Sequence, residues 1–219
     1  MDVQIQIQNV QLNGNMAVPN SASGLIIFAH GSGSGRFSPR NKFVAEKMNS
    51  RGFATLLFDL LAEEEEKKYQ TRFDIDLLTE RLIGATKWCM ENTEVGKVHI
   101  GYFGASTGSA AALSAAAYWG TKIGAVVSRG GRPDLALEEL DLVEAPTLLI
   151  VGGDDKEVID LNRKAYMKLG CVKKMEIVPG AGHLFEEEGA LEKVAELAGL
   201  WFERHLGTKG VEEGVATHG

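Results

Sequence analysis

The sequence predicts an α/β fold in which helices flank a mostly parallel sheet. Two observations support this prediction. Short apolar runs, such as those at 25–30 and 147–152, recur along the chain, and segments with helical periodicity separate them. Strands that are apolar on both faces are typical of parallel sheets covered by helices. With 219 residues, 44% of them hydrophobic, the chain can form one large core. We therefore expect a single domain over residues 1–206.

The first elements are predicted to form an antiparallel edge. Val3, Ile5 and Ile7 alternate with glutamines, which is the period of a half-exposed strand. Asn13-Gly14 is typical of a hairpin turn, and a second strand follows it through Val18. Buried strands are then predicted at 25–30, 54–59, 98–103, 124–128, 147–152 and 174–178. Helices are predicted at 39–51, 74–92, 106–119, 133–140, 158–169 and 186–205.

Charge and composition restrict the classes of partner. The net charge of -7 and the isoelectric point near 5.3 argue against nucleic acid or an anionic membrane as the main partner. The longest apolar runs are too short to span a bilayer, so we expect a cytoplasmic protein. Its expected partner is a small-molecule substrate, and it is expected to be a monomer or homodimer. Cys89 and Cys171 have no metal-ligand spacing, and neither a metal nor a cofactor is expected. The polar segment 207–219 is predicted to be a flexible tail.

The most informative motif is Gly104-Ala105-Ser106-Thr107-Gly108, which lies between a predicted strand and an alanine-rich helix. In such an elbow, the two glycines leave room for a sharp turn that exposes the serine hydroxyl. The hydroxyl then stands at a helix N-terminus, where developing negative charge is favoured. We therefore predict that Ser106 is a nucleophile.

A serine nucleophile needs a base and a carboxylate that orients the base, and both follow in the chain. Asp154 and Asp155 come directly after the strand at 147–152, and His183 follows the strand at 174–178. Only one of the two adjacent carboxylates can face the histidine, and the Gly-x-x-Asp spacing from Gly152 favours Asp155. The ends of these strands border the expected ligand crevice. His183 is accordingly predicted to be the general base.

Stabilisation of an oxyanion is predicted at two backbone N–H groups. One belongs to Thr107, which follows the nucleophile, and the other to Ser32 in the glycine-rich loop 30–35. His30 is interpreted as a scaffold for this loop, because His183 already supplies a base.

These motifs resemble those of the α/β-hydrolase superfamily, and more narrowly of the dienelactone hydrolase family. The resemblance is carried by 30–33, 104–108, 152–155 and 182–183, which span nearly the whole chain. It implies an eight-stranded, mostly parallel sheet and hydrolysis of an ester-like bond through an acyl-enzyme. One departure is Ser106, because dienelactone hydrolases proper have cysteine there. The resemblance therefore does not extend to dienelactone as the substrate.

The substrate is expected to be small and to carry an anionic group. Between 128 and 147 there is room only for a short helix, where many hydrolases insert a lid, so no large lid domain is predicted. Four arginines lie on the loops around the predicted site, at 36, 40, 129 and 132. Arg36 and Arg129 are the first candidates for contacts with a substrate anion, and the alternative is that they are surface charges or bind neighbouring carboxylates.

Three other classes of function share features with this sequence. The strand, glycine-rich loop and helix at 25–51, with Asp59 after the next strand, are similar to a dinucleotide-binding unit. That fingerprint requires glycine or alanine where this chain has Arg36, and Pro39 starts the helix too late. A catalytically silent binding module is disfavoured by the complete set of catalytic residue types. An acyltransferase would use the same residues and remains the alternative to hydrolysis.

Overall fold

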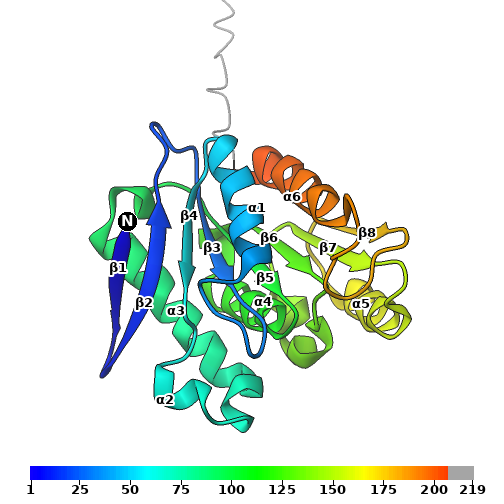
Figure 1. Ribbon diagram of the computed structural model, residues 1–219, viewed down its shortest axis with the longest axis horizontal. Helices are drawn as coiled ribbons and strands as arrows, with labels where there is room; N and C mark the ends of the chain where they lie inside the picture. Colours follow the sequence, from blue (N-terminus) through cyan, green and yellow to red (C-terminus); the bar gives the residue numbers. More distant parts are fainter. Residues whose placement is uncertain (207–219) are drawn as a thin grey trace, which may run out of the picture.

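The computed structural model describes residues 1–206, which form one eight-stranded sheet with the order β1-β2-β4-β3-β5-β6-β7-β8 (Figure 1). The strands are β1 (Asp2–Ile7), β2 (Val10–Ala17), β3 (Leu25–Ala29), β4 (Ala54–Phe58), β5 (Ile100–Ala105), β6 (Ile123–Arg129), β7 (Thr147–Gly152) and β8 (Lys173–Val178). Strand β2 is antiparallel to both of its neighbours, and the other pairs are parallel. The predicted fold class, a mostly parallel sheet flanked by helices, is confirmed.

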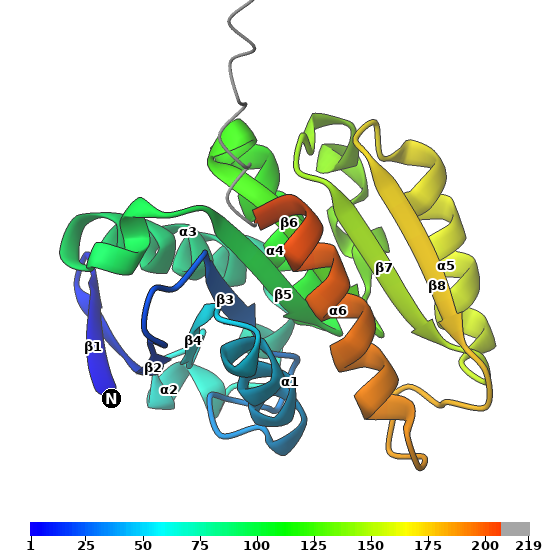
Figure 2. The ribbon, with the colours of Figure 1, turned by 90° about the horizontal axis from the view of Figure 1, so that it is seen from above.

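Helices cover the sheet on both sides, and the view from above shows the layers (Figure 2). The helices are α1 (Pro39–Ser50), α2 (Glu63–Glu66), α3 (Ile75–Asn92), α4 (Thr107–Trp119), α5 (Lys156–Lys168) and α6 (Ala190–Leu206). One buried cluster includes residues of α3 and α4, and the cluster on the opposite face includes residues of α1 and α6. Every residue of β3, β4, β5 and β7 is buried, as the continuous apolar runs predicted. The prediction of a buried strand at 174–178 is wrong, because β8 lies at the edge of the sheet and only its last residue, Val178, is buried.

The predicted hairpin turn at Asn13-Gly14 is wrong. Both residues lie inside β2, and the turn from β1 to β2 is made at 8–9, where Gln8 has φ 50°. Gly14 serves the sheet instead, because a Cβ on it would lie 3.0 Å from Val3 Cγ2 and 3.1 Å from Leu56 Cδ1. A glycine in a strand often marks such a close approach, so this Asn-Gly pair reflects packing inside the sheet rather than a turn.

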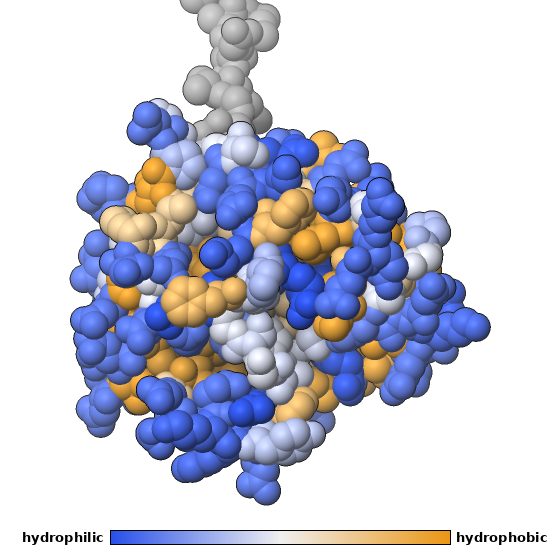
Figure 3. Space-filling model, in the orientation of Figure 1, coloured by the Kyte–Doolittle hydropathy of each residue, from blue (hydrophilic) through white to orange (hydrophobic). Residues whose placement is uncertain are grey.

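The segment between β6 and β7 also differs in kind from its prediction. A helix was expected at 133–140, and the structure has a 3-10 segment over Pro133–Leu142 with non-helical angles at Ala136. No lid-sized insertion occurs here within residues 1–206. The predicted tail, 207–219, lies outside the described residues. Among the described helices, none has the length and apolar character that crossing a membrane requires. The face in Figure 3 is mainly hydrophilic, with hydrophobic side chains in small separate patches.

Candidate active site

Ser106 occupies a strained turn between β5 and α4. Its φ of 51° and ψ of -121° lie in a region that side chains other than glycine rarely adopt. Packing holds the turn in place, since a Cβ on Gly108 would collide with the carbonyl of Ala29, and one on Gly104 with the backbone of Ser109. The Ser106 hydroxyl therefore stands at the N-terminus of α4, as the elbow motif predicted.

The structure brings the three predicted catalytic side chains together. His183 Nε2 lies 3.3 Å from Ser106 Oγ, and His183 Nδ1 lies 2.6 Å from Asp155 Oδ2. Asp154 is exposed and makes no side-chain contact with the histidine, so the choice between the two carboxylates falls on Asp155. This arrangement can carry a proton from the serine hydroxyl to the imidazole while the carboxylate fixes the orientation of the ring.

Backbone hydrogen bonds hold the loop that carries Asp155 against the loop that carries His183. The N–H of Gly153 donates to the carbonyl of Val178 at 2.8 Å, and the N–H of Asp154 donates to the carbonyl of Ala181 at 3.0 Å. These bonds join the C-terminal ends of β7 and β8. Asp155 and His183 consequently approach each other even though 28 residues separate them.

The carbonyl of Ser106 accepts three hydrogen bonds that were not predicted from the sequence. It accepts hydrogen bonds from the Ser109 N–H at 3.1 Å, the Ser109 hydroxyl at 2.8 Å and the Arg132 N–H at 3.1 Å. A serine three residues after the nucleophile, in the first turn of a helix, is the signal that could have indicated this. Three donors on one carbonyl fix the backbone of the elbow.

His30 connects the glycine-rich loop to the end of β4. Its Nδ1 donates to the carbonyl of Gly31 at 2.9 Å, and its Nε2 accepts from the N–H of Leu60 at 3.0 Å. Burial lowers the pKa of His30, which favours the neutral ring that these two bonds require. Gly31 then approaches Ser106 so closely that a Cβ on the glycine would lie 3.1 Å from Ser106 Cβ. The scaffold interpretation of His30 agrees with these contacts.

The N–H of Ser32 has an acceptor that the sequence did not indicate. It donates to the side-chain hydroxyl of Thr107, with N and Oγ1 2.9 Å apart. The two predicted oxyanion donors are therefore adjacent, but the Ser32 amide is already engaged. The backbone N–H of Thr107, the first helical residue of α4, has no intrahelical acceptor.

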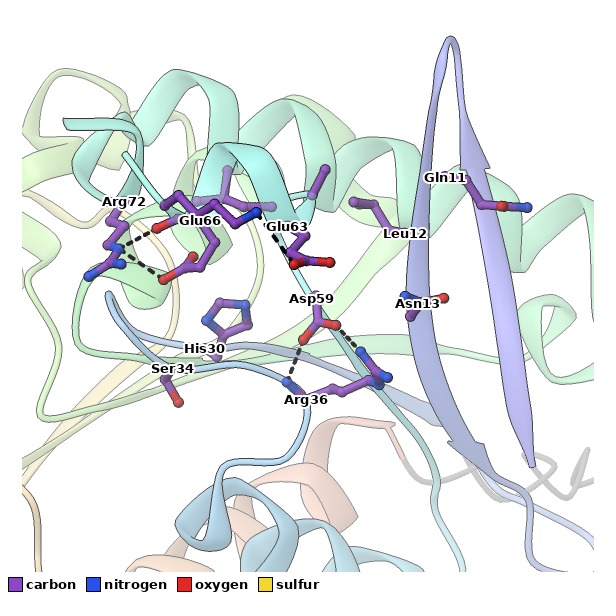
Figure 4. A pocket seen from close by; sticks show the side chains of 13 residues that line it. Gln11, Leu12, Asn13, His30, Ser34, Arg36, Asp59, Glu63, Glu66 and Arg72 are labelled. Atoms are coloured by element: carbon purple, nitrogen blue, oxygen red, sulfur yellow. Dashed lines mark hydrogen bonds and ion pairs between the residues drawn. The ribbon is translucent and has the colours of Figure 1, made fainter. Parts of the chain in front are cut away.

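Arg36 is paired with a carboxylate. Its guanidinium forms an ion pair with Asp59, and its backbone N–H donates to the same carboxylate at 2.9 Å. Both residues line a cavity of about 620 Å³ beside the glycine-rich loop, in which Arg72 also faces Glu66 (Figure 4). Ser106 does not line this cavity. The cavity is lined by both acidic and basic side chains, and Arg36 and Arg72 are each paired with a carboxylate. Its walls therefore do not select for an anion.

Arg129 is different, because it is buried without a carboxylate. Its exposed fraction is 5%, and the salt bridges among residues 1–206 do not include it. The contacts of the guanidinium are a 3.4 Å hydrogen bond to Asn41 Oδ1 and the ring of Phe185, whose centroid lies 5.8 Å from Cζ. Burial and the nearby Arg40 lower the pKa of Arg129 to about 10. The side chain nevertheless stays charged at neutral pH.

The segment that carries Arg129 touches both Ser106 and the loop of His183. The N–H of Ser106 donates to the carbonyl of Arg129 at 3.2 Å. The next residue, Gly130, has φ 51°, and a Cβ on it would lie 2.9 Å from the carbonyl oxygen of His183. The unpaired guanidinium is thus attached to the backbone that separates Ser106 from the histidine loop.

The chain is similar to known proteins in sequence and in fold. A sequence profile of the dienelactone hydrolase family matches residues 12–206. A solved dienelactone hydrolase from Anabaena variabilis is 52% identical, with a TM-score of 0.91, over 94% of this chain and 97% of that one. Est1E from Butyrivibrio proteoclasticus is 16% identical, with a TM-score of 0.77, over 93% of this chain and 98% of that one, which is a likeness of fold.

A curated protein from Mycobacterium tuberculosis is also similar. It is named as a candidate phosphoribosyl transferase and is 52% identical over 205 residues, which make up 94% of this chain and 46% of that protein. The chain thus spans about half the length of the curated relatives it matches.

The sheet order and the elbow define an α/β-hydrolase fold. The chain belongs to the dienelactone hydrolase family, with nearly all of the described residues inside the match. The resemblance inferred from the motifs is confirmed.

Proposed function

We propose that the protein is a serine hydrolase that cleaves the ester or lactone bond of a small molecule through an acyl-enzyme. The observation that carries this proposal is the contact of His183 with both Ser106 and Asp155, at 3.3 Å and 2.6 Å. Membership of the dienelactone hydrolase family supports hydrolysis as the class of reaction.

In the proposed mechanism, Ser106 Oγ attacks the substrate carbonyl while His183 Nε2 takes the hydroxyl proton. Asp155 accepts a hydrogen bond from Nδ1–H and stabilises the imidazolium that forms. The tetrahedral intermediate then loses its alkoxide, which receives the proton from His183 and leaves as the alcohol. Water attacks the acyl-enzyme by the same proton transfers and releases the acid. The N-terminus of α4 favours the negative charge that develops in both steps.

Acyl transfer is the second candidate, because an acceptor alcohol could replace water in the last step. The name of the Mycobacterium tuberculosis relative belongs to a protein of which this chain matches 46%. The geometry at Ser106 favours acyl chemistry for the matched part. Release of the free acid in water, without an added alcohol, would distinguish hydrolysis from transfer.

We expect short acyl chains to be preferred. Only a 3-10 segment connects β6 to β7, so no lid covers the elbow from this connection. Acetyl and butyryl p-nitrophenyl esters should give kcat/KM values above that of the palmitoyl ester, because an open site buries little of a long chain and gains little binding energy from it. A series of matched p-nitrophenyl esters measures this preference. Faster hydrolysis of the long-chain esters would contradict the proposal.

We further propose that the substrate carries an anion that contacts Arg129. Of the two arginines singled out from the sequence, Arg36 is paired with Asp59, whereas Arg129 is paired with no carboxylate of residues 1–206. The Arg129→Gln variant should raise KM for an ester with a carboxylate by about tenfold, since a charge-assisted hydrogen bond is lost. The matched neutral ester should be affected less than about twofold.

The Arg36→Gln variant is the matched control for this prediction, and it should change the two KM values to the same small extent. The Arg129→Lys variant keeps the charge and should recover part of the affinity for the anionic ester. Equal effects of Arg129→Gln on the charged and neutral esters would assign Arg129 a structural role.

A further inference from the structure

We propose that Thr107 is a catalytic residue whose side-chain hydroxyl donates a hydrogen bond to the oxyanion. The Ser32 amide acts through this hydroxyl by donating a hydrogen bond to it. The inference rests on the proposed serine hydrolase function. The oxyanion site then consists of the backbone N–H and the side-chain hydroxyl of Thr107.

The Thr107 hydroxyl is a buried donor whose proton is not engaged within residues 1–206. A threonine hydroxyl has one proton to donate and two lone pairs that accept. One lone pair accepts the N–H of Ser32 at 2.9 Å. Within residues 1–206, the hydroxyl proton itself has no hydrogen-bond acceptor, and with Thr107 only 4% exposed it has little access to water. A buried donor without an acceptor is costly, so a role at a reacting centre is a sufficient reason to retain it.

Thr107 also lies where an oxyanion would form. Thr107 is the first residue of α4, so its hydroxyl has no preceding helical turn to which it could donate. On one side lies Ser106, and on the other lies the loop in which Gly31 approaches the nucleophile to 3.1 Å, measured from a Cβ built on the glycine. An oxyanion that forms on the carbon bonded to Ser106 Oγ would develop beside this residue. The hydroxyl and the backbone N–H of Thr107 can then donate to the same atom.

The hydrogen bond from Ser32 also makes the Thr107 hydroxyl a better donor. A hydroxyl that accepts a hydrogen bond becomes a stronger donor, because hydrogen bonds in a chain polarise one another. The Thr107 proton has no acceptor within residues 1–206, and the hydrogen bond that it gives to the substrate oxygen becomes strong when negative charge forms on that oxygen. An interaction that is stronger in the transition state than in the ground state increases kcat rather than affinity. The Ser32 amide contributes to the same step by polarising the hydroxyl.

The test compares Thr107→Val with Thr107→Ser. Valine keeps the shape of the side chain and removes the hydroxyl, so kcat for a short p-nitrophenyl ester should fall about 100-fold with KM nearly unchanged, as for the loss of one oxyanion donor. Serine keeps the hydroxyl and should retain most of kcat. Circular dichroism and the melting temperature should show that both variants are folded, and Thr107→Ala provides a second hydroxyl-free variant if valine disturbs the fold.

An unchanged or higher kcat in Thr107→Val would overturn the inference, because it would mean that the freed Ser32 amide binds the oxyanion directly. Equal losses in Thr107→Val and Thr107→Ser would overturn it as well, since packing rather than the hydroxyl would then be responsible. A fluorophosphonate that labels the wild type, but not Ser106→Ala, tests the proposed function separately. If the wild type is neither labelled nor active on esters, the proposed function itself fails, and this inference fails with it.

Discussion

Replacement of Ser106 by alanine is expected to reduce the turnover of a short p-nitrophenyl ester by at least about 10⁴-fold. Without the hydroxyl, His183 has no proton to accept, and no acyl-enzyme can form. The effect should be confined to kcat, with the melting temperature close to that of the wild type, because the change removes one hydroxyl and keeps the Cβ and the backbone of the elbow, with its φ of 51°.

The Ser114→Ala variant is the matched control. Ser114 lies in the same helix, α4, two turns after the elbow, and is placed in no catalytic role. Its turnover should equal that of the wild type. Wild-type turnover in Ser106→Ala, measured where the control is active, would show that another group is the nucleophile.

The second large effect is expected at the acid. Asp155→Asn should lower kcat by about 10³- to 10⁴-fold, because an amide cannot stabilise the imidazolium and favours the wrong tautomer of His183. Asp154→Asn, the neighbouring and isosteric change, should alter kcat less than about twofold, since Asp154 is exposed and does not touch the ring.

Steady-state kinetics of the two variants on the same ester measures this difference. A larger loss in Asp154→Asn would place the acid at residue 154. Equal losses would indicate that the loop as a whole, rather than one carboxylate, orients the histidine.

Much of the fold follows from local patterns in the sequence. Continuous apolar runs predicted the buried strands, because only a doubly covered parallel sheet hides both faces of a strand. The elbow at Ser106 was also predictable, because its glycines and its serine lie within five residues and the constraint is local. The chain order of serine, acid and histidine then indicated which strand ends meet.

Contacts between distant residues could not be predicted in this way. Gly14 resembles a turn residue until β1 and β4 are placed on either side of it. The pairing of Arg36 with Asp59 depends on β3 and β4 being neighbours, and the bond from Ser32 to Thr107 joins residues that are 75 positions apart. Each of these contacts is a property of packing and leaves no periodic signal in the sequence.

The central claim is that Ser106 forms the acyl-enzyme, and trapping that intermediate tests it most directly. A short p-nitrophenyl ester, mixed rapidly with the protein and quenched in acid, should leave one acyl group per chain in the intact-mass spectrum. Peptide mapping should place that group on Ser106, and Ser106→Ala should carry none. An acyl group on another residue of the active protein, or turnover with Ser106 unmodified throughout, would contradict the account.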